Sequence, residues 1–111
     1  MQNTFIAIAQ VDELAIHEMK PLEIAGKRLL LVRTTDDYYV VDEMCSHEDY
    51  SLALGCIKGD RIRCSLHGSY FDLDSGKPLD EPADEPIGSY AVKIIDQTIF
   101  VDLKQARNPS L

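Results

Sequence analysis

Two short segments, each combining a cysteine with a histidine, place the strongest constraint on how this chain folds. The first reads C-S-H, with Cys45 and His47, and the second reads C-S-L-H, with Cys64 and His67. The sixteen residues between them include the pair Gly59 and Asp60, which is typical of a tight turn. The chain can therefore run out and back so that the second pair lies beside the first.

The rest of the sequence is dominated by short strands. Residues 28–34 (RLLLVRT) and 38–44 (YYVVDEM) are rich in β-branched, aliphatic and aromatic residues around the turn sequence TDD, so they predict a hairpin. Residues 89–95 and 98–103 predict a second hairpin for the same reason. No window carries a helical stripe over three turns, and the best one stops at Pro21. The expected fold class is all-β, a sandwich or small barrel.

Composition limits the function. A chain of 111 residues fits a single domain, and its net charge of −8 disfavours nucleic acid or an anionic membrane as a partner. No segment has the length of a membrane span, and the N-terminus lacks the features of a signal peptide, so we expect a soluble, cytoplasmic protein. Three cysteines in such a compartment more often serve metals or chemistry than disulfides.

The four cysteine and histidine residues lie on loops at strand ends. Cys45 and His47 follow a strand that ends near residue 43, and Cys64 and His67 precede one that begins near residue 69. Two thiolates and two imidazoles can complete a tetrahedral zinc site. They can also divide between the two irons of a [2Fe-2S] core. Zinc sites usually pair like ligands locally, whereas each loop here holds one of each kind.

The pattern resembles the Rieske [2Fe-2S] family, in particular the small ferredoxins of ring-hydroxylating dioxygenases. The resemblance rests on CSH, the sixteen-residue separation, CSLHG, FDLDSGKP and PADEPIGSYAVKI, and it extends over residues 5–103. It implies that Cys45 and Cys64 bind the inner iron and that His47 and His67 bind the outer iron. It also implies that Gly68 lets the chain turn directly after the last ligand.

The resemblance further implies an antiparallel β-sandwich. Residues 1–103 would form a single Rieske domain with a cluster-binding subdomain at about 44–70, and residues 104–111 would form a polar C-terminal tail that frays. The segment with Pro82, Ala83 and Pro86 matches a loop that covers the cluster from a third side.

The implied function is that of a one-electron carrier rather than an enzyme. A reductase would reduce the cluster, and the chain, as a monomer that binds its partners transiently, would pass the electron to a terminal oxygenase that acts on an aromatic ring. Two alternatives stay open. One is the small subunit of another redox complex such as nitrite reductase, and the other is a zinc-stabilised interaction module.

Departures from the high-potential members of the family predict a low reduction potential. Those members have two extra cysteines, and the matching positions here are Tyr50 and Leu66. They also have a tyrosine near a cluster cysteine, and the matching position is Phe71, although Ser69 keeps a hydroxyl nearby. Fewer hydrogen bonds to sulfur place the potential in the lower part of the Rieske range of about −150 to +300 mV.

The remaining cysteine and histidine and several acidic residues have simpler interpretations. We expect Cys56 to be a small buried thiol, His17 to be a surface histidine and Asp102 to belong to a solvated face. Six acidic residues near His47 and the proline-containing loop are candidates for a docking rim: Glu48, Asp49, Asp80, Glu81, Asp84 and Glu85.

Overall fold

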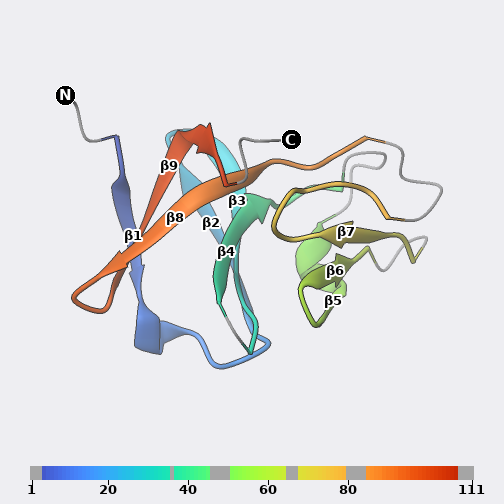
Figure 1. Cartoon of the computed structure of the whole chain (residues 1–111), viewed down its shortest axis with the longest axis horizontal. Helices are drawn as coiled ribbons and strands as arrows, with labels where there is room; N and C mark the ends of the chain where they lie inside the picture. Colours follow the sequence, from blue (N-terminus) through green and yellow to red (C-terminus); the bar gives the residue numbers. More distant parts are fainter. Residues whose placement is uncertain (1–3, 36, 46–50, 65–67, 80–84, 108–111) are drawn as a thin grey trace.

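The computed structural model describes residues 4–35, 37–45, 51–64, 68–79 and 85–107 (Figure 1). Nine strands and two short 3-10 helices follow one another along this part of the chain. In order they are β1 (Ile6–Gln10), η1 (Val11–Glu13), β2 (Met19–Ile24), β3 (Lys27–Arg33), β4 (Tyr38–Asp42), η2 (Leu52–Leu54), β5 (Cys56–Lys58), β6 (Arg61–Arg63), β7 (Tyr70–Asp72), β8 (Ser89–Ile95) and β9 (Thr98–Ala106). The predicted all-β class is confirmed.

Six strands form an antiparallel sheet in the order β1-β9-β8-β4-β3-β2. Both predicted hairpins are present, as β3–β4 and β8–β9. Pro21 lies on β2 at the edge of the sheet, where a missing backbone N–H costs no interior ladder bond. The described residues contain no helix long and apolar enough to cross a membrane.

Strand β3 is buried on both faces, which explains its uninterrupted apolar run. Leu29 and Leu31 pack on one side with β1, β8 and β9, while Leu30 and Val32 pack on the other with the second sheet. All four side chains have no solvent exposure. The large sheet therefore separates two hydrophobic clusters. The cluster that contains Leu30 and Val32 also contains Cys45 and Cys64.

Strands β5, β6 and β7 form the second sheet, on the right in Figure 1. The turn predicted at Gly59 and Asp60 joins β5 to β6, and Ile57, Ile62 and Phe71 lie opposite one another in register. The sequence predicted the turn but not the strands β5 and β6. Each has three residues, which is too short for an alternating pattern to be recognised.

The C-terminal segment is ordered further than expected. Strand β9 continues to Ala106, and the Arg107 backbone N–H donates to the carbonyl of Ser89 at 2.9 Å. The Arg107 guanidinium binds the carboxylates of Asp37 and Asp74 at 2.8 and 3.1 Å. The expectation that the chain frays after Leu103 is therefore wrong for residues 104–107.

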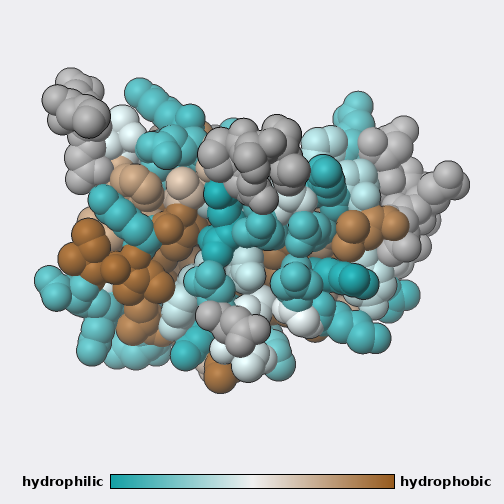
Figure 2. Space-filling model, viewed as in Figure 1, coloured by the Kyte–Doolittle hydropathy of each residue, from teal (hydrophilic) through white to brown (hydrophobic). Residues whose placement is uncertain are grey.

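The surface is uneven in hydropathy. Figure 2 shows hydrophobic residues gathered at the left, over the end of the large sheet where β8 turns into β9, and mostly hydrophilic residues at the right. Ile6, Ile94 and Ile95 are among the exposed hydrophobic residues. This apolar area lies at the opposite end of the molecule from the β5–β7 sheet.

Candidate metal centre

The structure brings the two predicted cysteine ligands into one buried environment. Cys45 lies three residues beyond β4 and is 5% exposed, and Cys64 follows β6 directly and has no exposure. Both belong to a single core cluster with Leu52, Ile62 and Phe71. The predicted convergence of the two loops thus holds for the cysteines. His47 and His67 lie outside the described residues.

This environment suits a [2Fe-2S] core with two cysteine and two histidine ligands. Two ferric ions, two sulfides and two thiolates have no net charge, so such a group can lie against apolar side chains without the cost of burying an isolated ion. Among the described residues no group of three or more histidine, cysteine, aspartate or glutamate residues could hold a metal. Two of the four predicted ligands are not among those residues.

The loop after Cys64 is closed by its own backbone. The Cys64 N–H donates to the Ser69 carbonyl, and the Gly68 N–H donates to the Cys64 carbonyl, both at 2.8 Å. Gly68 has a φ of +76°, which favours glycine, and a Cβ atom there would lie 3.0 Å from the guanidinium of Arg63. The structure supports the turn role predicted for Gly68.

A buried carboxylate holds the base of the first loop. Glu43 is 6% exposed and accepts hydrogen bonds from Ser51 Oγ at 2.6 Å and from Arg28 Nε at 3.1 Å. Its carbonyl accepts from the Leu52 N–H at 2.7 Å. These bonds tie the two ends of the loop that contains Cys45 together. The sequence analysis did not predict that Glu43 holds this loop, because a glutamate at the end of a strand is usually exposed to solvent.

The base of the proline-containing segment is tied to the same strand. Asp42, the last residue of β4, accepts hydrogen bonds from the Gly88 N–H at 2.7 Å and the Tyr90 hydroxyl at 2.6 Å. Burial, followed by the bond to Asp42, raises the pKa of Tyr90, so the phenol remains a donor. A Cβ atom on Gly76 would lie 2.0 Å from the Ile87 carbonyl oxygen, which shows how closely the two segments pack. Pro82 and Ala83 lie outside the described residues.

The positions predicted to tune the potential are both buried. Phe71 has no solvent exposure and packs in the cluster that contains the two cysteines. Ser69 is also fully buried, and its carbonyl holds the N–H of Cys64. Tyr70, between them, points to the other side of β7 and is partly exposed.

Two expectations about other residues are wrong. Cys56 is exposed, because Ile57 takes the inward position of the three-residue strand β5 and leaves Cys56 on the outer face. Asp102 is fully buried. Its carboxylate accepts hydrogen bonds from the Thr4 hydroxyl, the Lys104 N–H and the Gln105 amide, and the bond from Thr4 is the main cause of its lowered pKa.

The expectations for His17 and for the acidic docking rim have different outcomes. His17 is exposed as predicted, with its ring nitrogen 3.2 Å from the Thr35 hydroxyl. Of the six acids of the predicted docking rim, Glu85 is described and is exposed, while the others lie outside the described residues. The docking rim stays a prediction.

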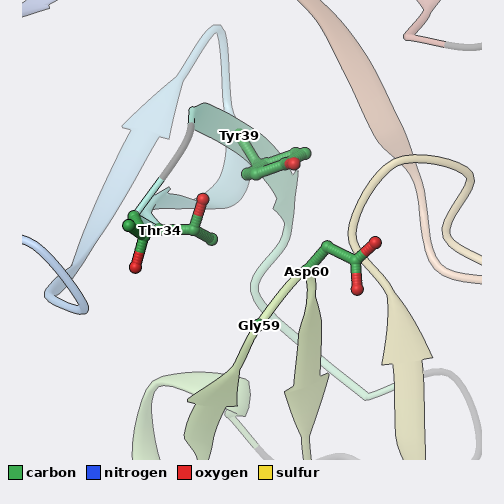
Figure 3. A pocket seen from close by; sticks show the side chains of 5 residues that line it. Thr34, Tyr39, Gly59 and Asp60 are labelled. Carbon is green, nitrogen blue, oxygen red and sulfur yellow. The ribbon is translucent and has the colours of Figure 1, made fainter.

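A cavity of about 380 Å³ lies between the β3–β4 turn and the β5–β6 turn (Figure 3). Thr34, Thr35, Tyr39, Gly59 and Asp60 line it. It sits at the ends of β4 and β6 that are remote from the cysteines, and its lining contains no cysteine or histidine. It is therefore separate from the candidate metal centre.

Comparisons with known proteins identify the family and agree with the fold. The family model for the Rieske [2Fe-2S] domain matches residues 4–91. The ferredoxin component of a naphthalene 1,2-dioxygenase system from Pseudomonas aeruginosa is 31% identical over 98 residues, which cover 84% of this chain and 94% of that protein. The ferredoxin of carbazole 1,9a-dioxygenase from Nocardioides aromaticivorans superposes with a TM-score of 0.83 at 28% identity, covering 89% of this chain and 97% of that one.

A further solved structure shares the fold. A protein described as the small subunit of an NADPH nitrite reductase has a TM-score of 0.78 at 23% identity, with 89% of this chain and 98% of that chain covered. At this identity the likeness concerns the fold alone.

Proposed function

This chain belongs to the Rieske [2Fe-2S] domain family, and from that premise we propose that it shuttles single electrons from a reductase to the terminal oxygenase of a ring-hydroxylating dioxygenase system. The relatives named above are ferredoxin components of such systems, which supports a carrier rather than a catalyst of bond chemistry. The oxygenase, not this chain, would select the aromatic substrate.

The chain carries one Rieske-type cluster, which supplies the capacity to take up and release one electron. We assign Cys45 and Cys64 to the inner iron and His47 and His67 to the outer iron. The observation that carries this assignment is the burial of both cysteines in one core cluster, although they come from loops nineteen positions apart. Leu52, Ile62 and Phe71 exclude water from the thiolate side.

The set of two thiolate and two imidazole ligands explains why the reduction potential is higher than that of a cluster with four thiolates. With two thiolates the core is neutral when oxidised and gains one negative charge on reduction, whereas four thiolates would start from −2. An electron enters a neutral core more easily, so the potential lies above the roughly −400 mV of plant-type ferredoxins. The absence of a tyrosine at position 71 keeps it in the lower part of the Rieske range.

The carrier role sets requirements for the partners. A reductase and an oxygenase must each bind long enough for one electron to pass and then release the chain. We propose that the chain acts as a monomer in the cytoplasm and forms transient complexes with both. A tight complex with either partner would block the other step.

Analysis of the purified protein tests the proposal. A red-brown protein with iron and acid-labile sulfide in equal amounts, and a Rieske-type electron paramagnetic resonance spectrum after reduction, is the expected result. A colourless protein that holds one zinc ion would contradict it. Reduction by a dioxygenase reductase and reoxidation by its oxygenase, followed by stopped-flow absorption, then tests the shuttle.

A further inference from the structure

One charged side chain lies against the backbone of the loop that runs from Cys64 to Gly68. The guanidinium of Arg63 lies 3.0 Å from the place that a Cβ atom of Gly68 would take, and three of its atoms lie within 3.6 Å of that place. Arg63 directly precedes Cys64, and Gly68 directly follows His67. The positive charge of Arg63 therefore lies beside both ends of the loop that contains two of the assigned ligands.

Gly68 leaves room for this contact. Its φ of +76° favours glycine, and a Cβ atom 3.0 Å from the guanidinium would be closer than ordinary van der Waals contact allows. The Gly68 N–H donates to the Cys64 carbonyl at 2.8 Å. The guanidinium of Arg63 thus covers the hydrogen-bonded closure of the loop.

No carboxylate of the small sheet stands opposite Arg63. On the outer face of this sheet its neighbours in register are Cys56 on β5 and Tyr70 on β7. Asp72 is on the same face, but it stands opposite Arg61, nearer the β5–β6 turn. Within the described part of the chain, Arg63 forms no ion pair.

The other acid near this strand and the loop itself leave the charge of Arg63 in place. Asp60 is at the β5–β6 turn, at the end of β6 that is remote from Cys64. Positions 65–67 are serine, leucine and histidine, so the loop has no acidic residue in its sequence. The charge of Arg63 is therefore not balanced by its neighbours in the sheet or by the loop that it covers.

A cation in this place acts differently on the two redox states of the cluster. With two thiolate and two imidazole ligands the cluster is neutral when oxidised and has a charge of −1 when reduced. A nearby positive charge attracts the reduced state and has little effect on the neutral state. It therefore raises the one-electron midpoint potential.

We propose that Arg63 is an electrostatic determinant of the midpoint potential, through the charge that it holds against the loop of Cys64 and His67. This inference rests on the proposed function. The charge offsets part of the stabilisation that is lost because position 71 has no tyrosine hydroxyl. Uptake of an electron from the reductase becomes more favourable as a result.

A mediated redox titration at pH 7, followed by the visible spectrum, tests this role. We expect Arg63→Gln to lower the equilibrium constant for one-electron reduction about threefold at low ionic strength. A threefold change corresponds to about 30 mV for one electron. Salt at about 1 M should remove most of the difference, because it shortens the Debye length to about 3 Å.

Three control variants separate charge from geometry. Arg63→Lys keeps the charge without the planar group and should keep the midpoint near that of wild type. Arg61→Gln removes an equal charge farther from the loop, opposite Asp72, and should shift the midpoint less. Lys93→Gln, on β8 of the large sheet, should not shift it. An unchanged midpoint in a cluster-containing Arg63→Gln protein, or an equal shift in Arg63→Lys, would overturn the inference.

Cys56 provides a test that leaves Arg63 in place. Cys56 is exposed and stands opposite Arg63 in register. Cys56→Glu would put a carboxylate beside the guanidinium and should lower the midpoint, whereas Cys56→Gln should leave it unchanged. If Arg63→Gln does not assemble the cluster, an unchanged midpoint in Cys56→Glu would overturn the inference.

These measurements also separate the inference from the proposed function. A wild-type protein that holds zinc in place of iron and sulfide would overturn both. A cluster-containing wild type whose midpoint is insensitive to Arg63 would overturn this inference alone. A midpoint that responds to Arg63 in a protein that exchanges electrons with neither a reductase nor an oxygenase would support this inference and overturn the proposed shuttle.

Discussion

Replacing Phe71 by tyrosine tests both the location of the cluster and the origin of its low potential. Phe71 is fully buried in the core cluster with Cys45 and Cys64, so a hydroxyl added to its ring enters a space without solvent. There the hydroxyl either reaches a cysteine sulfur or stays without a partner. The two outcomes differ in sign and in the property they change.

A hydrogen bond from the new hydroxyl to sulfur would favour the reduced state, which carries the additional negative charge. A net bond energy of about 1 kcal/mol corresponds to a rise of about 40 mV in a one-electron midpoint potential. A hydroxyl without a partner would instead lower the free energy of unfolding by about 1–3 kcal/mol and leave the potential unchanged.

Protein-film voltammetry at pH 7 measures the midpoint potential, and the visible spectrum reports that the cluster is intact. Tyr70→Phe is the matched control, because Tyr70 points to the other side of β7 and should not change the potential. If Phe71→Tyr does not assemble the cluster, Ser69→Ala provides the converse test and should lower the potential. An unchanged or lower midpoint in an intact Phe71→Tyr protein would refute the placement of this side chain beside a sulfur ligand.

Three further predictions follow from named contacts. Cys64→Ser should remove the cluster, seen as loss of visible absorption and bound iron, whereas Cys56→Ser, at an exposed position, should retain both. Arg107→Ala should lower the free energy of unfolding by about 2 kcal/mol in urea titrations, because the variant loses a ring contact with Tyr39 and two half-exposed ion pairs. The control Lys104→Ala should change the free energy of unfolding by less than about 0.5 kcal/mol. Asp102→Asn should be less stable than wild type at pH 7 and equally stable in acid. The lowered pKa of the Asp102 carboxyl group stabilises the fold at pH values above the pKa of the unfolded chain, about 3.9, and this stabilisation is lost as the pH falls through the pKa of the folded protein. A constant difference across pH would contradict this last prediction.

Residues with a local signal were predictable. The hairpins β3–β4 and β8–β9 have strands of five to nine residues and clear turns, so their type could be assigned from the sequence. The convergence of Cys45 and Cys64 could be predicted because the motif fixes their spacing, whereas their role as iron ligands stays a prediction. Strands β5 and β6 were missed because three residues show no period, and the exposure of Cys56 was missed with them.

Residues whose role depends on distant partners were not predictable. Asp102 on β9 is buried because Thr4 and Gln105 supply hydrogen bonds, and the partner Thr4 is 98 positions away in sequence. Arg107 is ordered because Asp37 and Asp74 converge on it from two other segments. A single sequence shows the polar residue but not the partner that makes its burial possible.

The end of β4 shows how the fold prepares the site. Asp42 fixes the segment that follows the proline-containing loop, and Glu43 fixes both ends of the first cysteine loop. Cys45, two residues later, then enters the core shared with Cys64. Because hydrogen bonds from the end of β4 hold three neighbouring segments, a small displacement of β4 would move Cys45 together with the segments on either side of it. The carboxylates of Asp42 and Glu43, which the sequence analysis did not single out, therefore hold the segments around the proposed metal centre in place.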